Sequence, residues 1–302
     1  MKGALCSPPR APLRGALGLA ADLVALTKPR VTSLVLLTAG VGMYLAPATD
    51  ASPTLPTLLA ALFATALAVA SANALNCWWE RDVDRHMDRT RDRPLPARRL
   101  DPQTALAFGL ALGVLSVPAL WIAANALTAG LGALALVVYV LGYTPLKRRS
   151  PWALPIGAVP GALPPLMGWT AVTGQLDLGG LGLFAILFVW QLPHFLAIGL
   201  FRKDDYARAG LKILPVVRGE MATRIHIALY VIALLPITLA LVPLGIAGVG
   251  YLAVAVVLGA SFFVWSMTGL RAEVGPRWAR GLFFVSLVHL SGLFLALVVF
   301  AA

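Results

Sequence analysis

The chain has 302 residues, of which 59% are hydrophobic and only 12% are charged. Soluble domains have about 25% charged residues, so this composition excludes an ordinary water-soluble fold. The formal net charge is +11, but the basic residues stand between apolar runs rather than on one polar segment. We therefore expect the charge to flank a membrane, and we expect no nucleic-acid partner.

Apolar runs of about 20 residues, long enough to cross a bilayer as helices, recur along the chain. Strand-like alternation is absent, so the sequence predicts an all-α, polytopic membrane protein. We divide it into a cytoplasmic N-terminal segment, 1–30, with an interfacial helix near 16–27, and a nine-helix membrane domain, 31–302. The nine predicted spans are 31–47, 54–79, 103–124, 126–146, 152–173, 179–200, 222–244, 247–270 and 279–301.

The basic residues check this count independently, because with nine spans every Lys and Arg cluster falls on the same side. The clusters occupy 2–30, 81–99, 147–149, 202–224 and 271–280. By the positive-inside rule, this side is cytoplasmic, the N-terminus is inside and the C-terminus is outside. Two connections on this side, 80–102 and 201–221, are long and polar, and long loops on a rigid scaffold tend to carry function.

The second span ends in a stripe of oxygen-bearing side chains. Asn76, Glu80, Asp84 and Asp88 are spaced by four residues, so they lie along one face if the helix continues. Mg²⁺ prefers oxygen ligands and is commonly held by one or two carboxylates together with substrate phosphates. We therefore predict Asn76, Glu80 and Asp84 as Mg²⁺ ligands. The alternative is a solvated helix end whose acids pair with nearby arginines, namely Arg81, Arg85 and Arg89.

A second polar segment follows the sixth span. Asp204 and Asp205 are candidates for holding another cation, and Lys203, Arg208 and Lys212 are candidates for binding phosphate oxygens. A plain juxtamembrane loop has a similar composition. Further cationic groups on the same side are Lys28, Arg30, Lys147, Arg148 and Arg149.

Gln191 and His194 lie within the apolar sixth span. Polar side chains there are costly unless they face a cavity or a partner, so both are functional candidates. The alternative is hydrogen bonding within the helix bundle.

Together these features suit a lipid diphosphate whose tail lies in the bilayer. The carboxylates would hold a metal, the cations would bind phosphate, and the apolar bundle lies behind them. Ionising an allylic diphosphate requires a neutralised leaving group and a site that excludes water. The sequence therefore predicts an active site at the cytoplasmic side.

These residues resemble those of the UbiA-type intramembrane prenyltransferases, and in particular the branch of that family that acts on heme. The similar motifs run from residue 27 to 216 in the family's order. They include Thr27-Lys28-Pro29-Arg30-Val31, Asn76-x3-Glu80-x3-Asp84, Tyr143-Thr144-x2-Lys147-Arg148, Trp190-Gln191-x-Pro193-His194-Phe195 and Asp205-Tyr206-x2-Ala209-Gly210.

The resemblance implies a UbiA-type bundle in the bacterial inner membrane. It also implies Mg²⁺-dependent transfer of the farnesyl group of farnesyl diphosphate to the 2-vinyl group of heme B, and association with heme A synthase or terminal oxidase assembly. The implied catalytic residues are Asn76, Glu80, Asp84, Asp88 and His194, with His194 facing the heme. The implied substrate-binding residues are Lys28, Arg30, Arg81, Lys147, Arg148, Gln191, Lys203, Asp204, Asp205 and Tyr206.

Two departures from the family pattern stand out. Position 80 is Glu where many relatives have Asp. Arg208 and Ala209 stand where the second motif of quinone-type relatives has an acid, which argues against a full second metal site. The alternative functions are a family member that prenylates 4-hydroxybenzoate or a naphthoate, and a membrane transporter that uses the proline-rich fifth span as a gate.

Overall fold

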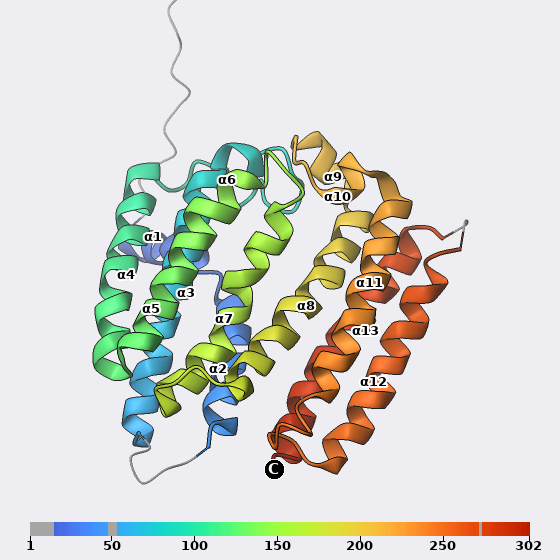
Figure 1. The fold of residues 1–302 in the computed structure, drawn as a ribbon. Helices are drawn as coiled ribbons and strands as arrows, with labels where there is room; N and C mark the ends of the chain where they lie inside the picture. The colour runs from blue at the N-terminus through green and yellow to red at the C-terminus, as the bar shows by residue number, and fades with distance from the viewer. Residues whose placement is uncertain (1–14, 48–52, 272–273) are drawn as a thin grey trace, which may run out of the picture.

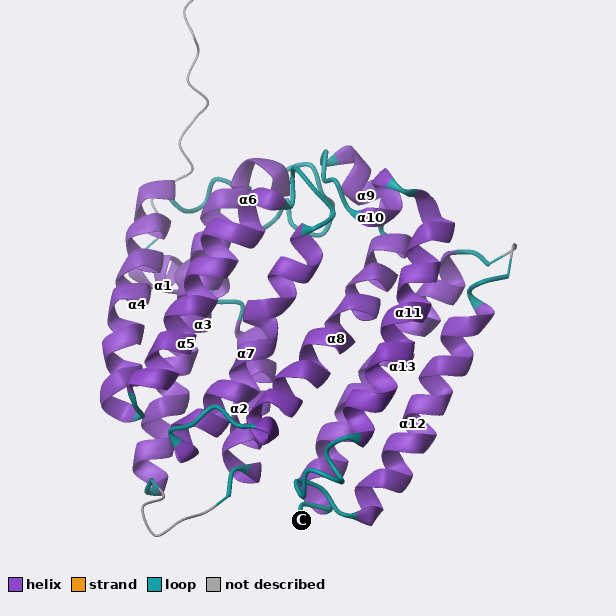
Figure 2. Cartoon of the chain, viewed as in Figure 1, coloured by secondary structure: helices purple, strands orange, loops and turns teal. Residues whose placement is uncertain are grey.

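The computed structural model describes residues 15–47, 53–271 and 274–302. This part of the chain is helical and contains no β-strand (Figure 2). The helices are α1 (Ala16–Leu26), α2 (Pro29–Leu45), α3 (Leu55–Asp84), α4 (Pro102–Ala123), α5 (Ala126–Val137), the π-helix η1 (Val138–Tyr143), α6 (Thr144–Leu146), α7 (Ala153–Thr173), α8 (Leu178–Phe201), α9 (Lys203–Arg208), α10 (Leu214–Val217), α11 (Gly219–Leu239), α12 (Val249–Thr268) and α13 (Pro276–Val299).

The long helices form two groups joined in the middle of the bundle (Figure 1). In the first group, α3 packs on α4, α4 on α5, α5 on α7 and α7 on α2. In the second group, α8 packs on α11 and α13, and α12 lies against α11 and α13. Contacts of α7 with α8 and of α2 with α13 join the groups, so α2, α7 and α8 form the centre.

Each of the nine predicted spans corresponds to helix in the described residues, but the count of nine spans is not confirmed. Seven helices are long and apolar enough to cross a membrane, or eight if α1 and α2, bent by 48° at their junction, form one broken span. Alone, α2 has only 17 residues. α7 has 21 residues but includes Pro160, Pro164 and Pro165, and it is not among the seven. The chain is an integral membrane protein.

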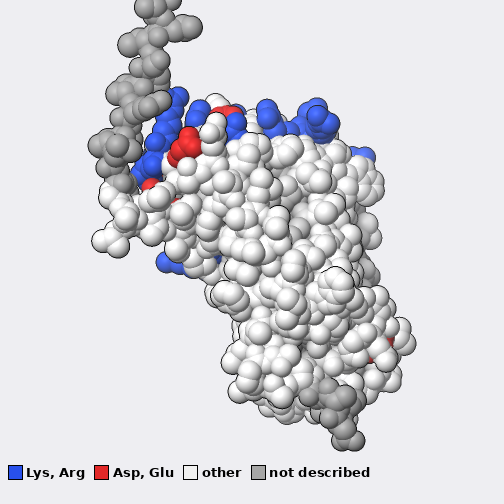
Figure 3. Space-filling view, turned by 90° about the vertical axis from the view of Figure 1, so that its left-hand side faces the viewer, with Lys and Arg blue, Asp and Glu red and all other residues white. Residues whose placement is uncertain are grey.

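The charged side chains follow the predicted one-sided pattern. Figure 3 shows Lys and Arg gathered mainly at one end of the bundle. The α3–α4 loop, the α6–α7 turn and the α9–α10 segment lie at this end (Figure 1). The connections 124–125 and 174–177, at the opposite end, contain no Lys or Arg. Residues 1–14 of the predicted N-terminal segment and 48–52 of the first outer connection lie outside the described residues.

The helix predicted near 16–27 is present as α1 and packs against α3 and α4. Its buried Asp22 pairs with Arg99 of the α3–α4 loop at 3.3 Å. Lys28, between α1 and α2, has a left-handed backbone with φ of 51°, which is uncommon for a residue with a side chain. The interfacial position of α1 stays a prediction.

α2 and α7 pack with their backbones almost in contact. A Cβ atom at Gly168 would lie 1.9 Å from the carbonyl oxygen of Ala39, and one at Gly42 would lie 2.0 Å from that of Pro165. Small residues allow such close crossings between membrane helices. Because α7 also packs on α8, this crossing positions the centre of the bundle.

We therefore expect Gly168→Ala to destabilise the protein, by about 1–3 kcal/mol for overpacking. Gly130→Ala in α5 is the matched control, because nothing lies within 4 Å of a Cβ atom at that position. Thermal unfolding in detergent measures both variants. Equal melting temperatures for Gly168→Ala and the wild type would contradict the close packing.

Candidate active site

The predicted oxygen stripe forms at the C-terminal end of α3. The helix continues to Asp84, as the four-residue spacing required, and Asn76, Glu80 and Asp84 are all buried. Asp88 lies beyond the helix end, and its side chain is 64% exposed. The stripe therefore consists of three buried groups followed by one exposed carboxylate.

Each buried group of the stripe faces a basic side chain from another segment. The three contacts are Lys28 Nζ to Asn76 Oδ1 at 3.0 Å, Lys147 Nζ to Glu80 Oε1 at 3.1 Å and Arg93 Nη1 to Asp84 Oδ2 at 2.9 Å. The interpretation as a solvated helix end with Arg81, Arg85 and Arg89 as partners is wrong for these three residues, because their partners come from elsewhere.

Lys147 is more enclosed than Arg93, with only 16% of its side chain exposed against 31%. Burial acts to lower the pKa of Lys147, but the facing Glu80 carboxylate outweighs burial and raises that pKa above its ordinary value. Lys147 therefore carries a fixed positive charge, as a phosphate-binding group requires.

A π-helical turn, η1, lies just before Lys147 in the chain. η1 ends at Tyr143, and Thr144, the next residue, accepts a hydrogen bond from Asn76 Nδ2 at 3.4 Å and donates one to the carbonyl oxygen of Tyr139 at 2.8 Å. The centre of the Tyr143 ring lies 5.6 Å from Lys147 Nζ. π-helical turns are frequent at functional sites. Thr144 belongs to a recognised motif, but it was not among the predicted site residues.

The second acidic segment meets the first through Arg208. Its guanidinium donates hydrogen bonds to Asp205 Oδ1 and, at 3.1 Å, to Asp88 Oδ2. These hydrogen bonds raise the pKa of Arg208 above its ordinary value. Arg208 was considered for phosphate binding but was not among the site residues that the resemblance implied.

Apolar and aromatic contacts dock the same two segments. Val83, Met87 and Leu211 form a small buried cluster. The guanidinium of Arg89 donates to the Tyr206 hydroxyl at 3.3 Å and lies 5.6 Å from the centre of that ring. The predicted residues Asp88, Asp205 and Tyr206 are therefore brought together at the basic end.

A cavity of about 80 Å³ opens beside Lys147, between the α6–α7 turn, α8 and the α9–α10 segment. Its polar lining comes from Tyr143, Lys147, Ser150, Tyr206 and Lys212, and α8 contributes Phe195, Leu196 and Gly199. The cavity is therefore lined by cationic side chains and by apolar side chains.

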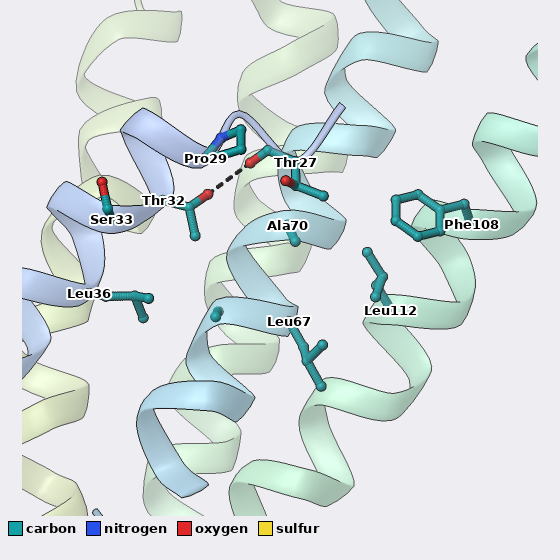
Figure 4. Close-up of a pocket in the computed structure, with 10 residues that line it drawn as sticks. Thr27, Pro29, Thr32, Ser33, Leu36, Leu67, Ala70, Phe108 and Leu112 are labelled. Atoms are coloured by element: carbon teal, nitrogen blue, oxygen red, sulfur yellow. Dashed lines mark hydrogen bonds between the residues drawn. The ribbon is translucent and has the colours of Figure 1, made fainter. Parts of the chain in front are cut away.

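A separate groove of about 330 Å³ lies between α2, α3 and α4 (Figure 4). Its lining is apolar apart from the hydroxyl-bearing residues Thr27, Thr32 and Ser33 near the α1–α2 junction. Thr32 donates to the Thr27 carbonyl oxygen at 2.8 Å. The groove and the cavity beside Lys147 share no lining residue.

Gln191 and His194 make hydrogen bonds within the bundle. Gln191 Nε2 donates to the carbonyl oxygens of Leu187, at 2.9 Å, and Ala158, at 3.3 Å. His194 Nδ1 lies 2.8 Å from Ser286 Oγ of α13, and its ring stacks on Trp190. These contacts match the helix-packing alternative, and a role of either residue toward a substrate stays a prediction.

The remaining predicted residues lie away from the buried stripe or point to solvent. Arg81 donates to the carbonyl oxygen of Trp78 at 2.7 Å, and Lys203 pairs with Glu220 at 3.0 Å. Arg30, Arg148 and Asp204 are exposed. No described contact brings these side chains to the buried acids.

The oxygen-bearing side chains of this site suit a hard cation that is also bound by waters and substrate phosphates. Within the described residues, no three His, Cys, Asp or Glu side chains lie close enough to hold a metal ion together. Mg²⁺ does not need such a cage, because it is usually bound by one or two carboxylates, waters and substrate phosphates. One oxygen of the buried Asp205 carboxylate has no hydrogen-bond partner in the described part of the chain, as expected of an oxygen available to such a cation.

Comparison with known sequences agrees with this chemistry. Residues 35–288 match the UbiA prenyltransferase family. The chain is 55% identical to the protoheme IX farnesyltransferase of Myxococcus xanthus, over 92% of this chain and 94% of that protein. It is 56% identical to the protoheme IX farnesyltransferase of Sorangium cellulosum, over 80% of this chain and 86% of that protein.

Two solved structures share the fold at low identity. A structure of digeranylgeranylglyceryl phosphate synthase is 16% identical, with a TM-score of 0.79 over 93% of this chain and 97% of that one. A UbiA homologue from Archaeoglobus fulgidus bound to DMAPP and Mg²⁺ is also 16% identical, with a TM-score of 0.62 over 92% of this chain and 99% of that one. On the match over residues 35–288 and the high identity to these relatives, the chain belongs to the UbiA prenyltransferase family.

Proposed function

We propose that this protein transfers the farnesyl group of farnesyl diphosphate to the 2-vinyl group of protoheme IX (heme B), giving heme O and diphosphate. The 55% identity to a protoheme IX farnesyltransferase over nearly the whole chain supports this acceptor and donor. The geometric observation that carries the proposal is the row of buried polar groups on α3, each faced by a cation.

We propose Mg²⁺ as the cofactor, held by Asn76, Glu80 and Asp84 together with phosphate oxygens of the substrate. The A. fulgidus homologue bound to DMAPP and Mg²⁺ supports this choice. When bound, Mg²⁺ supplies positive charge that makes diphosphate a better leaving group. The oxygen of Asp205 that has no partner among the described residues offers a further ligand at the same end of the bundle.

The protein's own cations contribute to the same step. Lys147, Lys28 and Arg93 already lie against the buried stripe, where they are positioned to neutralise the departing diphosphate. The apolar helices behind them exclude water and shelter the farnesyl cation. The C1–O bond to diphosphate breaks to give this cation, and the terminal vinyl carbon of the heme then bonds to C1 of the farnesyl cation. Water adds to the adjacent carbon and loses a proton, which gives a hydroxyethylfarnesyl side chain.

We also propose that the basic end faces the cytoplasm of the bacterial inner membrane, with the N-terminus inside and the C-terminus outside. The one-sided distribution of Lys and Arg supports this orientation. A soluble diphosphate headgroup then meets the site from the cytoplasm, while its tail and the heme lie in the bundle. Association with heme A synthase or terminal oxidase assembly stays a prediction.

Product analysis tests the acceptor. Membranes that contain this protein should convert heme B to heme O when farnesyl diphosphate and Mg²⁺ are supplied, and chromatography with mass spectrometry identifies the product. Family membership favours prenyl transfer over transport. If heme B is unchanged and 4-hydroxybenzoate or a naphthoate is prenylated in the same assay, the proposed acceptor is wrong and the aromatic acid is the acceptor.

Asp84→Asn tests the oxygen stripe. We expect turnover to fall by about 100-fold or more, the usual effect of removing one charge-stabilising contact from an active site, because a neutral amide binds a cation less strongly. The control is Asp82→Asn, since the side chain of Asp82 is 64% exposed and pairs with Arg85 on the surface. Size-exclusion profiles in detergent check that both variants fold. Near-normal turnover in the Asp84 variant would refute a role of the stripe.

A further inference from the structure

Arg208 joins two carboxylates that are far apart in the sequence. Its Nη2 atom donates to Asp88 Oδ2, 120 residues away, at 3.1 Å, and also to Asp205 Oδ1. Asp88 follows the C-terminal end of α3, and Asp205 lies on α9. The ends of both acidic segments are therefore held by a single guanidinium.

Asp205 is the buried member of this group. The residue is only 7% exposed, and its Oδ2 atom has no hydrogen-bond partner among the described residues. A buried carboxylate oxygen without a partner is unfavourable unless the site serves to receive a ligand. Arg208 thus satisfies only one of the two oxygens, and the carboxylate can accept a second positive group.

Arg208 differs from the other cations of the site in its exposure. Its side chain is 60% exposed, compared with 31% for Arg93 and 16% for Lys147. A long exposed side chain turns to a new partner without losing packing or burying charge. Of these three ion pairs to buried acids, the pair with Asp205 is therefore the easiest to exchange.

We propose that Arg208 is a positioning residue that exchanges partners when the substrate binds. In the ligand-free protein it holds Asp205 and Asp88 together. When a divalent cation and diphosphate bind, the cation takes the Asp205 carboxylate and the guanidinium turns to a phosphate oxygen. This inference rests on the proposed function for its ligand, a diphosphate carried with a divalent cation.

The exchange leaves the Asp205 carboxylate and the guanidinium paired, because the carboxylate passes from guanidinium to metal while the guanidinium passes from carboxylate to phosphate. Asp88 keeps Arg91, at 3.7 Å, as a partner. The proposal also predicts that Arg208 changes two binding affinities in opposite directions, that of the cation alone and that of the cation with diphosphate. Arg208 opposes the binding of a cation alone, because its own positive charge lies against the Asp205 carboxylate that the cation would use. Arg208 assists binding of the cation–diphosphate complex, because it then contacts the phosphate.

The test measures binding to the full-length protein in detergent, first of Mn²⁺ alone and then of inorganic diphosphate in saturating Mn²⁺, by titration calorimetry. For Arg208→Leu we expect Mn²⁺ alone to bind about tenfold more tightly and diphosphate about tenfold more weakly, the size expected for one charge-assisted hydrogen bond. Arg208→Lys keeps the charge and should change both affinities less.

Arg85→Leu is the matched control, because Arg85 pairs with the exposed Asp82 at 3.3 Å and its loss changes the net charge equally. Neither affinity should change more than about twofold, as expected for an exposed pair. If Arg208→Leu weakens both affinities, or leaves Mn²⁺ binding unchanged, the partner exchange is refuted. The measurement needs neither heme nor turnover, so a wrong acceptor would leave its result unaffected.

Discussion

The rest of the site depends on the burial of carboxylates at one end of an apolar helix bundle. Burying an ion costs on the order of several kcal/mol in lost solvation, so Glu80, Asp84 and Asp205 each require a positive partner. The structure supplies these partners as Lys147, Arg93 and Arg208, all from outside the membrane-spanning helices. Charge pairing therefore determines which loops must fold back over the end of α3.

The same requirement explains why the long connections lie at the basic end. The α3–α4 loop returns Arg93 to Asp84, the α6–α7 turn places Lys147 on Glu80, and α9 brings Arg208 to Asp205. Connections at the opposite end, such as 124–125 and 174–177, make no such pairs and are short. A prenyl diphosphate with a divalent cation offers the complementary set of charges, so the proposed ligand fits the arrangement that stabilises the protein.

Much of the fold was predictable because membrane helices satisfy their own backbone and must be long and apolar. The helical ranges and the one-sided basic loops agree with the structure. The span count was less predictable. The predicted first span, 31–47, already has the 17-residue length of α2, but whether α1 and α2 count as one broken span depends on the bend of 48° between them. That bend depends on contacts such as that of Lys28 with Asn76. Hydropathy reads composition along the chain and carries no information on such contacts.

By itself, the sequence determined the faces within single helices. A spacing of four residues places Asn76, Glu80 and Asp84 on one stripe whatever surrounds them, because the helical repeat is local. Only the tertiary structure decided what faces that stripe. It paired the stripe with residues up to 68 positions away, turned His194 toward Ser286 and inserted a π-helical turn before Lys147. These outcomes depend on how helices pack against each other, and residue spacing along one chain does not specify that packing.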